Sequence, residues 1–76
     1  MFKQVDNKLI AKVTLKSFTA CIAKINEISV IAEELNHHPN LCITNYKDLK
    51  IEIFTHDKNT LTAKDKVLAN RIEKLF

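Results

Sequence analysis

The feature that most constrains the fold is one long amphipathic helical pattern, covering residues 18–35 and flanked by strand-like segments. Ser17 is a good N-cap for this helix. Pro39, the only proline, disfavours a helical conformation for the residue before it, so the helix should end near Asn36 or His37. The side chains expected at helical spacing on its apolar face are Phe18, Ile22, Ile25, Ser29, Ala32 and Leu35.

Four shorter segments have the features of β-strands. Before the helix, residues 2–5 could form a short edge strand, and residues 9–15 alternate between apolar and polar side chains. After it, residues 41–46 and 49–55 are separated only by a short connection at Lys47-Asp48, so they should pair as a hairpin. The chain contains no glycine, and we therefore expect Asn or Asp wherever a turn needs a positive φ angle.

The segment Thr62-Ala63-Lys64-Asp65 predicts the start of a last helix, because it resembles a capping box with Asp in place of Glu. The inward side chains of that helix should be Val67, Leu68, Ile72 and Leu75. The predicted order is β-β-α-β-β-α, an α+β fold with two helices on one face of a four-stranded, largely antiparallel sheet. Residues 1–76 make a single small domain, whose limited core favours association with another chain.

Composition narrows the functional classes. The net charge is +3 with lysines interleaved among acids, so nucleic-acid binding is permitted but not indicated. No apolar run approaches the roughly 20 residues of a membrane span, and no signal peptide is visible, so we expect a soluble cytoplasmic protein. Cys21 and Cys42 should be buried thiols in a reducing compartment, with a single bridge between them as the alternative.

The three histidines are the candidates for chemistry. His37 and His38 stand where the long helix ends, and His56 follows the last strand pattern. Imidazole is the side chain whose ordinary pKa lies nearest neutrality, so converging histidines suit proton transfer. Glu33 lies one turn before His37 and could orient its ring. Asp65, in the first turn of the last helix, could orient a histidine or accept a hydrogen bond from a substrate.

Each of these residues also has a simpler interpretation. The pair His37-His38 could be a solvated helix end, since helices often finish in polar residues before proline. His56 could be a turn residue, Tyr46 a strand residue and Asp65 an ordinary helix N-terminal acid. Three histidines could bind zinc, but adjacent histidines are awkward as co-ligands and no cysteine spacing indicates a finger.

Together these residues resemble the pattern of the pterin-4a-carbinolamine dehydratase family, at the family's spacing over seven positions: Glu33, His37, His38, Pro39, Tyr46, His56 and Asp65. The resemblance extends from about Phe2 to the C-terminus and implies the same sheet with helices on one face. It implies a hydro-lyase that removes water from 4a-hydroxytetrahydropterin to give quinonoid dihydropterin. Aromatic amino-acid hydroxylases form the hydroxylated pterin, so the reaction would recycle their cofactor. It further implies no metal or organic cofactor, the pterin being the substrate, and a homodimer or homotetramer.

The resemblance also implies roles for the individual residues. His37 and His56 would be the acid and base, and His38 would bind and orient the pterin, which makes these three the catalytic set. The substrate-binding or supporting residues would be Glu33, Pro39, Tyr46 and Asp65.

The sequence departs from the family pattern in four places. The family usually begins with an additional N-terminal helix, which this sequence lacks, and it usually has tryptophan where Leu41 stands. Asn36 replaces an acid before the paired histidines, and no glycine follows His56. These departures keep two alternatives open: a non-catalytic binding, coactivator-like or assembly module of the same fold, and a dehydratase for a different pterin.

Overall fold

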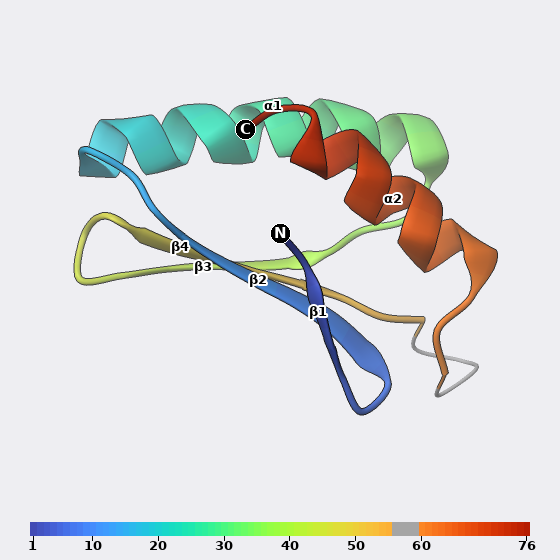
Figure 1. Ribbon diagram of the computed structural model, residues 1–76. Coiled ribbons are helices and arrows are strands. Elements are labelled where there is room, and N and C mark those ends of the chain that lie inside the picture. The colour runs from blue at the N-terminus through green and yellow to red at the C-terminus, as the bar shows by residue number, and fades with distance from the viewer. Residues whose placement is uncertain (56–59) are drawn as a thin grey trace.

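The computed structural model describes residues 1–55 and 60–76. Its elements, in chain order, are β1 (Lys3–Val5), β2 (Lys8–Thr14), α1 (Phe18–Leu35), β3 (Asn40–Thr44), β4 (Asp48–Ile53) and α2 (Ala63–Glu73). The strands form one antiparallel sheet in the order β1-β2-β4-β3, and both helices cover the same face of it (Figure 1). The predicted α+β fold and its order of elements are confirmed. No helix within the described ranges is long and apolar enough to cross a membrane.

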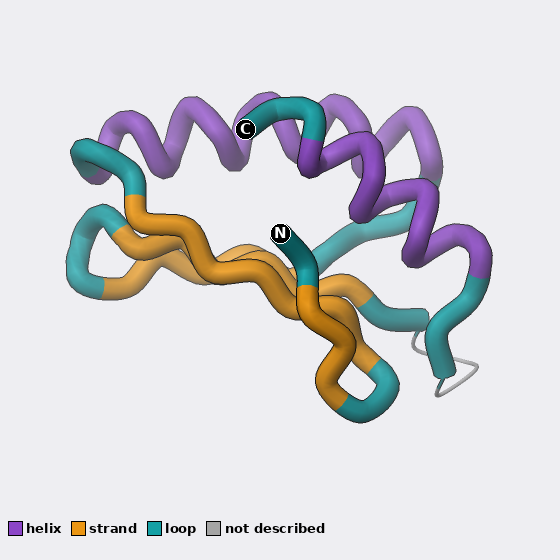
Figure 2. Tube along the Cα trace, in the orientation of Figure 1, coloured by secondary structure: helices purple, strands orange, loops and turns teal. Residues whose placement is uncertain are grey.

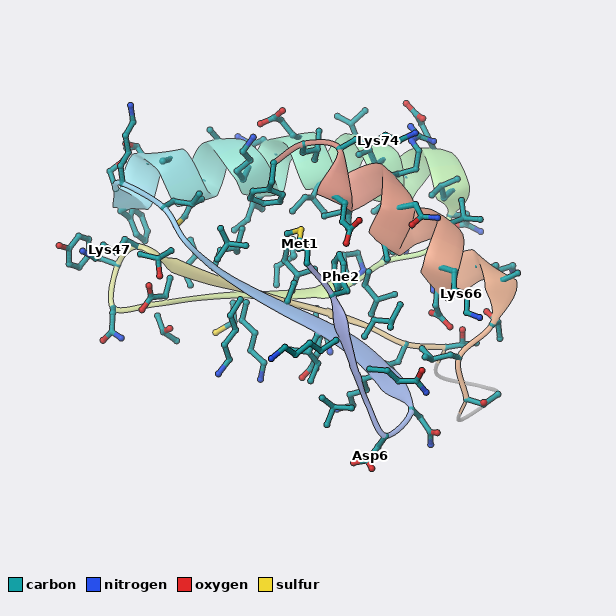
Figure 3. All side chains as sticks on the ribbon, in the orientation of Figure 1. Met1, Phe2, Asp6, Lys47, Lys66 and Lys74 are labelled. Atoms are coloured by element: carbon teal, nitrogen blue, oxygen red, sulfur yellow. The ribbon has the colours of Figure 1, made fainter. Side chains whose placement is uncertain are left out.

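The helices lie over one face of the sheet as a second layer (Figure 2), and the buried apolar side chains of both layers form one core cluster. The register of β2 with β4 sets Ala11 opposite Ile51, and both side chains are buried. Alternation along each strand therefore sends one set of apolar side chains toward the helices. Phe2 packs against this core from the start of the chain and lies between the layers (Figure 3). The fully buried side chains with the largest volumes include Ile28, Leu49, Ile51, Ile53, Leu68 and Ile72.

Capping residues fix the two ends of α1. The Ser17 side chain accepts a hydrogen bond from the backbone N–H of Ala20 at 3.0 Å, which satisfies a donor that the first turn leaves free. Asn36 ends the helix in the left-handed region with a φ angle of 49°. The backbone N–H of His37 then donates to the carbonyl of Ala32 at 3.1 Å. This C-cap fixes the direction in which the chain leaves α1, and so places the two histidines.

The buried faces of the helices differ in part from the prediction. Phe18 and Ile22 were expected to face inward but are 50% and 39% exposed. Ala32 is buried as predicted, and Ile25 and Leu35 are partly buried against the core. The other buried side chains of α1 are Cys21, Ile28 and Ile31. The buried face thus overlaps the predicted one but leaves out Phe18 and Ile22. On α2, Leu68 is buried as predicted, whereas Val67 is 47% exposed.

The hairpin between β3 and β4 turns earlier than predicted. β3 ends at Thr44, and the turn includes Asn45 and Tyr46, whose φ angles are 49° and 54°. A tight hairpin turn follows the twist of its strands when successive residues adopt positive φ angles. Asn45 agrees with the expectation of Asn or Asp at such positions, but Tyr46 does not. The prediction that Tyr46 belongs to the strand is therefore wrong, and Asp48 begins β4 rather than completing the turn.

The two cysteines have different surroundings. Cys21 is buried in the core, as predicted. Cys42 is exposed, because it pairs in register with Lys50 on the face of the sheet that the helices do not cover. The prediction of a buried Cys42 is wrong. Both thiols are free, which also rules out the alternative of a bridge between them.

Candidate functional site

The candidate site lies where the C-terminal end of α1 meets the N-terminal end of α2. His37 and His38 follow α1, and Asp65 sits in the first turn of α2. The two segments are distant in sequence but lie at the same end of the molecule (Figure 1). The arrangement brings a histidine and an acid together from two different elements.

His37 is bound directly to Asp65. The Nε2 atom of His37 lies 2.7 Å from Oδ1 of Asp65. The Asp65 side chain is completely buried, and the His37 side chain is 13% exposed. The second carboxylate oxygen, Oδ2, accepts the backbone N–H of Thr62 at 2.7 Å and the hydroxyl of Thr55 at 2.8 Å. A buried carboxylate with this many donors has a fixed position and orientation.

The surroundings of Asp65 keep it ionised. Burial alone raises the pKa of a carboxyl group, and it is the largest single influence on Asp65. The hydrogen bonds from His37, the Thr62 backbone and Thr55, together with the charge of His37, act in the opposite direction. Their sum leaves the pKa of Asp65 below its ordinary value. Asp65 is therefore a carboxylate near neutral pH.

The ionised state of Asp65 determines how the His37 ring is used. A carboxylate has no proton to donate, so Nε2 of His37 must carry the hydrogen that joins them. The other ring nitrogen, Nδ1, is then the atom that can take up or release a proton. An acid that fixes the tautomer of a histidine in this way is a recurrent arrangement in proton-transfer sites.

His38 makes a second pair, with Glu33 rather than with an acid on α2. Its Nε2 atom contacts Oε2 of Glu33, and both side chains are largely exposed, at 56% and 76%. The expectation that Glu33 would orient His37 is wrong. Once Asn36 has turned the chain out of the helix, His37 points toward α2 and His38 comes back over the last turn of α1.

A shallow cleft of about 200 Å³ opens beside His37. Its lining is mostly apolar and consists of Leu35, His37, Ala63, Lys64 and Val67. A larger hollow of about 530 Å³ lies on the uncovered face of the sheet, between residues such as Lys12, Cys42 and Lys50. None of the residues that line this hollow is a histidine. The smaller cleft is therefore the one in which His37 could act on a bound molecule.

The remaining candidate residues are distributed unevenly. Pro39 links His38 to β3, next to the site. Tyr46 lies beyond the other end of β3, a strand of five residues that spans about 16 Å. Figure 3 shows the neighbouring Lys47 at the opposite end of the molecule from Lys66 on α2. The fold of one chain thus does not bring Tyr46 to His37.

His56, the third predicted catalytic residue, lies outside the described residues. Among the residues that the structure describes, no three His, Cys, Asp or Glu side chains gather as metal ligands would. Two functional neighbours were missed in the sequence. Thr62 was recognised only as a helix cap, and nothing in the pattern around Thr55 indicates a contact with Asp65.

Comparisons with known proteins agree on one family. The model of the family described as pterin 4 alpha carbinolamine dehydratase matches residues 2–75. A protein of Sulfolobus acidocaldarius with the provisional name pterin-4-alpha-carbinolamine dehydratase is 36% identical over 70 residues, covering 92% of this chain and 76% of that protein. Pterin-4-alpha-carbinolamine dehydratase 2, mitochondrial, of Arabidopsis thaliana is 39% identical over 61 residues, which are 80% of this chain and 33% of that protein.

Two solved structures share the fold. A transcriptional coactivator/pterin dehydratase from Brucella melitensis superposes with a TM-score of 0.86 at 22% identity, covering 97% of this chain and 80% of its own. A pterin dehydratase-like protein, identified as a RuBisCO assembly factor in the alpha-carboxysome, gives a TM-score of 0.76 at 17% identity, covering 99% and 86%. At these identities the two structures show only that the fold is shared. The match of the family model over nearly the whole sequence is decisive, and the chain belongs to the pterin 4 alpha carbinolamine dehydratase family.

Proposed function

We propose that this protein dehydrates 4a-hydroxytetrahydropterin to quinonoid dihydropterin. The observation that carries the proposal is the buried, ionised Asp65 holding Nε2 of His37 at 2.7 Å beside an open cleft. Membership of the family supplies the substrate class. The geometry supplies a reason why His37 would be the working residue, since its free nitrogen is left available for a proton.

The reaction needs only proton transfers. The bond between the ring carbon C4a and its hydroxyl oxygen breaks, and the departing oxygen takes a proton to leave as water. A ring nitrogen of the pterin loses a proton, so that the remaining electrons form the new double bond. No electrons are gained or lost overall, and neither a metal nor an organic cofactor is required. Imidazoles suit both transfers near neutral pH.

The proposed roles follow the residues. His37 exchanges a proton through Nδ1, with Asp65 holding the ring and stabilising the imidazolium. The resemblance assigns the complementary proton transfer to His56. His38 follows His37, which lines the cleft, and its side chain is exposed. We assign it to binding and orienting the pterin. The apolar lining of the cleft, with Leu35 and Val67, suits a flat heterocycle.

The test is stopped-flow absorbance with enzymatically generated 4a-hydroxytetrahydropterin, comparing its decay with and without the protein. We expect acceleration over the spontaneous reaction, and a loss of about 10²–10⁴-fold in His37→Ala, the range usual for a general acid or base. Glu34→Gln is the matched control. It removes the charge from the 2.8 Å ion pair of Arg71 with Glu34, which joins the same two helices without touching His37.

Two results would contradict the proposal. One is the absence of acceleration by the folded wild-type protein. The other is a His37→Ala variant that keeps wild-type turnover. Equal losses in His37→Ala and Glu34→Gln would show that helix packing, and not proton transfer, had been measured.

A binding or assembly module of the same fold is the second candidate, and one observation favours it. α1 carries three exposed apolar side chains, Phe18, Ile22 and Val30, with Val30 58% exposed. Exposed apolar side chains suit a contact with another chain. We infer that they serve self-association into a homodimer or homotetramer, which would supplement the small core. Sedimentation of the purified protein at micromolar concentration tests the self-association, and a well-folded monomer would exclude it.

A further inference from the structure

Asp65 has more hydrogen bonds than its place in a helix cap requires. Its capping box with Thr62 already accounts for the start of α2, through the Thr62 N–H donating to Oδ2 at 2.7 Å. The hydroxyl of Thr55 donates to the same oxygen at 2.8 Å. Thr55 belongs neither to the helix nor to its cap. It stands just past the end of β4, ten residues before Asp65.

The hydroxyl groups of Thr55 and Thr62 contact each other and also Asp65. Their oxygens lie 3.1 Å apart, and each hydroxyl carries a single proton. Thr55 uses its proton on Oδ2 of Asp65 at 2.8 Å, whereas the single proton of Thr62 faces both that oxygen, at 3.3 Å, and the Thr55 hydroxyl oxygen. The shorter hydroxyl contact with Asp65 is therefore the one from Thr55. A hydroxyl whose proton is held by a buried carboxylate cannot rotate freely.

The consequence for Asp65 is a carboxylate that cannot turn. The backbone N–H of Thr62 and the hydroxyl groups of Thr55 and Thr62 all donate to Oδ2, at 2.7, 2.8 and 3.3 Å. Rotation about the bond to the carboxyl group would break these contacts in a buried place, where an unsatisfied donor is costly. The remaining oxygen, Oδ1, is consequently directed at His37.

We propose that Thr55 is a positioning residue for His37, acting through Asp65. Resting on the function proposed above, this assigns Thr55 to the proton-transfer step. Its hydroxyl fixes the carboxylate plane, and the carboxylate in turn fixes the ring and tautomer of His37. Thr55 is not itself in contact with His37. Its effect should therefore appear in the rate of the chemical step and in the state of the imidazole, and not in substrate affinity.

The variant Thr55→Val removes the hydroxyl and keeps the shape of the side chain. Thr55→Ser restores the hydroxyl, and Thr55→Ala is a second hydroxyl-free variant should the valine methyl not fit. The matched control is Thr14→Val. The Thr14 hydroxyl donates to Oδ1 of Asp48 at 2.8 Å, a bond of the same kind and length at an exposed place on the sheet.

The first readout is the Nε2–H signal of His37 in nitrogen-correlated NMR spectra. In the wild type this proton is held by a buried carboxylate and should exchange slowly with water. We expect the signal to be lost to exchange in Thr55→Val and Thr55→Ala, and to be retained in Thr55→Ser and Thr14→Val. The second readout is turnover: kcat should fall roughly tenfold in the two hydroxyl-free variants, the lower end for residues that orient a functional side chain, with KM unchanged.

The two readouts separate the inference from the proposed function. If the wild type does not accelerate dehydration, the proposed function fails, and the NMR comparison still decides what Thr55 does to His37. The inference is overturned if folded Thr55→Val keeps the slowly exchanging signal. It is also overturned if Thr55→Ser behaves like Thr55→Val, or if only the unfolding temperature changes, as a purely structural hydroxyl would require.

Discussion

Two histidine–carboxylate pairs stand next to each other in this molecule, and they have little in common beyond their chemistry. The His37–Asp65 pair joins two elements 28 residues apart, and its carboxylate is fully buried. The His38–Glu33 pair lies five residues apart at the end of one helix, and both of its side chains are mostly in water.

The two pairs differ in how strongly the surrounding structure holds them in place. An exposed ion pair is worth little, because water screens it and two side chains must be ordered to make it. Asp65, by contrast, receives further hydrogen bonds from Thr55 and Thr62, and losing a partner would leave a charge buried without compensation. The adjacent residues His37 and His38 are therefore constrained to different degrees. His37 is constrained by the fold, and His38 is free to adapt to a ligand.

The largest effect on stability should come from Asp65→Asn. The amide keeps the size of the side chain but carries no charge, and its NH₂ group meets donors where the carboxylate accepted them. Leaving buried donors without their acceptor costs about 1–3 kcal/mol, and we expect the free energy of unfolding to fall by that amount. Urea unfolding followed by circular dichroism measures it. A variant as stable as the wild type would show that the buried carboxylate is not under this constraint.

The difference in the free energy of unfolding between the wild type and Asp65→Asn should become smaller at acid pH. The folded pKa of Asp65 lies below its ordinary value of 3.8, so its ionised form stabilises the folded state. This contribution is complete well above that value and is lost as the pH falls through it toward the folded pKa. The pKa values of Asp48 and Glu52 are also lowered, but these residues occur in both proteins and cancel in the difference. Urea unfolding at pH 6, 4 and 3 tests this; a constant gap would contradict it.

Local sequence patterns were sufficient for most of the fold. Alternation predicted the strands, and Ser17 and the Thr62 capping box predicted where the helices begin, because these signals depend on neighbours in the chain. Which part of the apolar face of α1 is buried was not predictable in the same way. Phe18 and Cys21 are both acceptable core residues, and only packing against the sheet decides between them. Tyr46 was misplaced because a positive φ angle at tyrosine is set by the hairpin and not by the residue.

The site was predictable as a set of residues but not as a set of contacts. Residue type and position singled out His37, His38 and Asp65, and the resemblance added the family's spacing. It gave no means of pairing them, and the local rule that residues four apart on a helix are neighbours assigned Glu33 to the wrong histidine. The pairing depends on where Asn36 ends the helix and turns the chain. Thr55 was missed because its partner is fixed by the meeting of β4 with α2, a contact that leaves no periodic trace in the sequence.

The smallest effect should come from Glu33→Gln, which removes the charge from the exposed pair as Asp65→Asn does from the buried one. We expect the free energy of unfolding to change by no more than about 0.5 kcal/mol, as for most surface substitutions. The His37 Nε2–H signal should also be unchanged, since Glu33 does not contact that ring. Urea unfolding and the same NMR spectrum measure both quantities. A loss as large as that of Asp65→Asn would mean that the two pairs act as one unit, and that the exposure of His38 and Glu33 does not reflect their part in holding the end of α1.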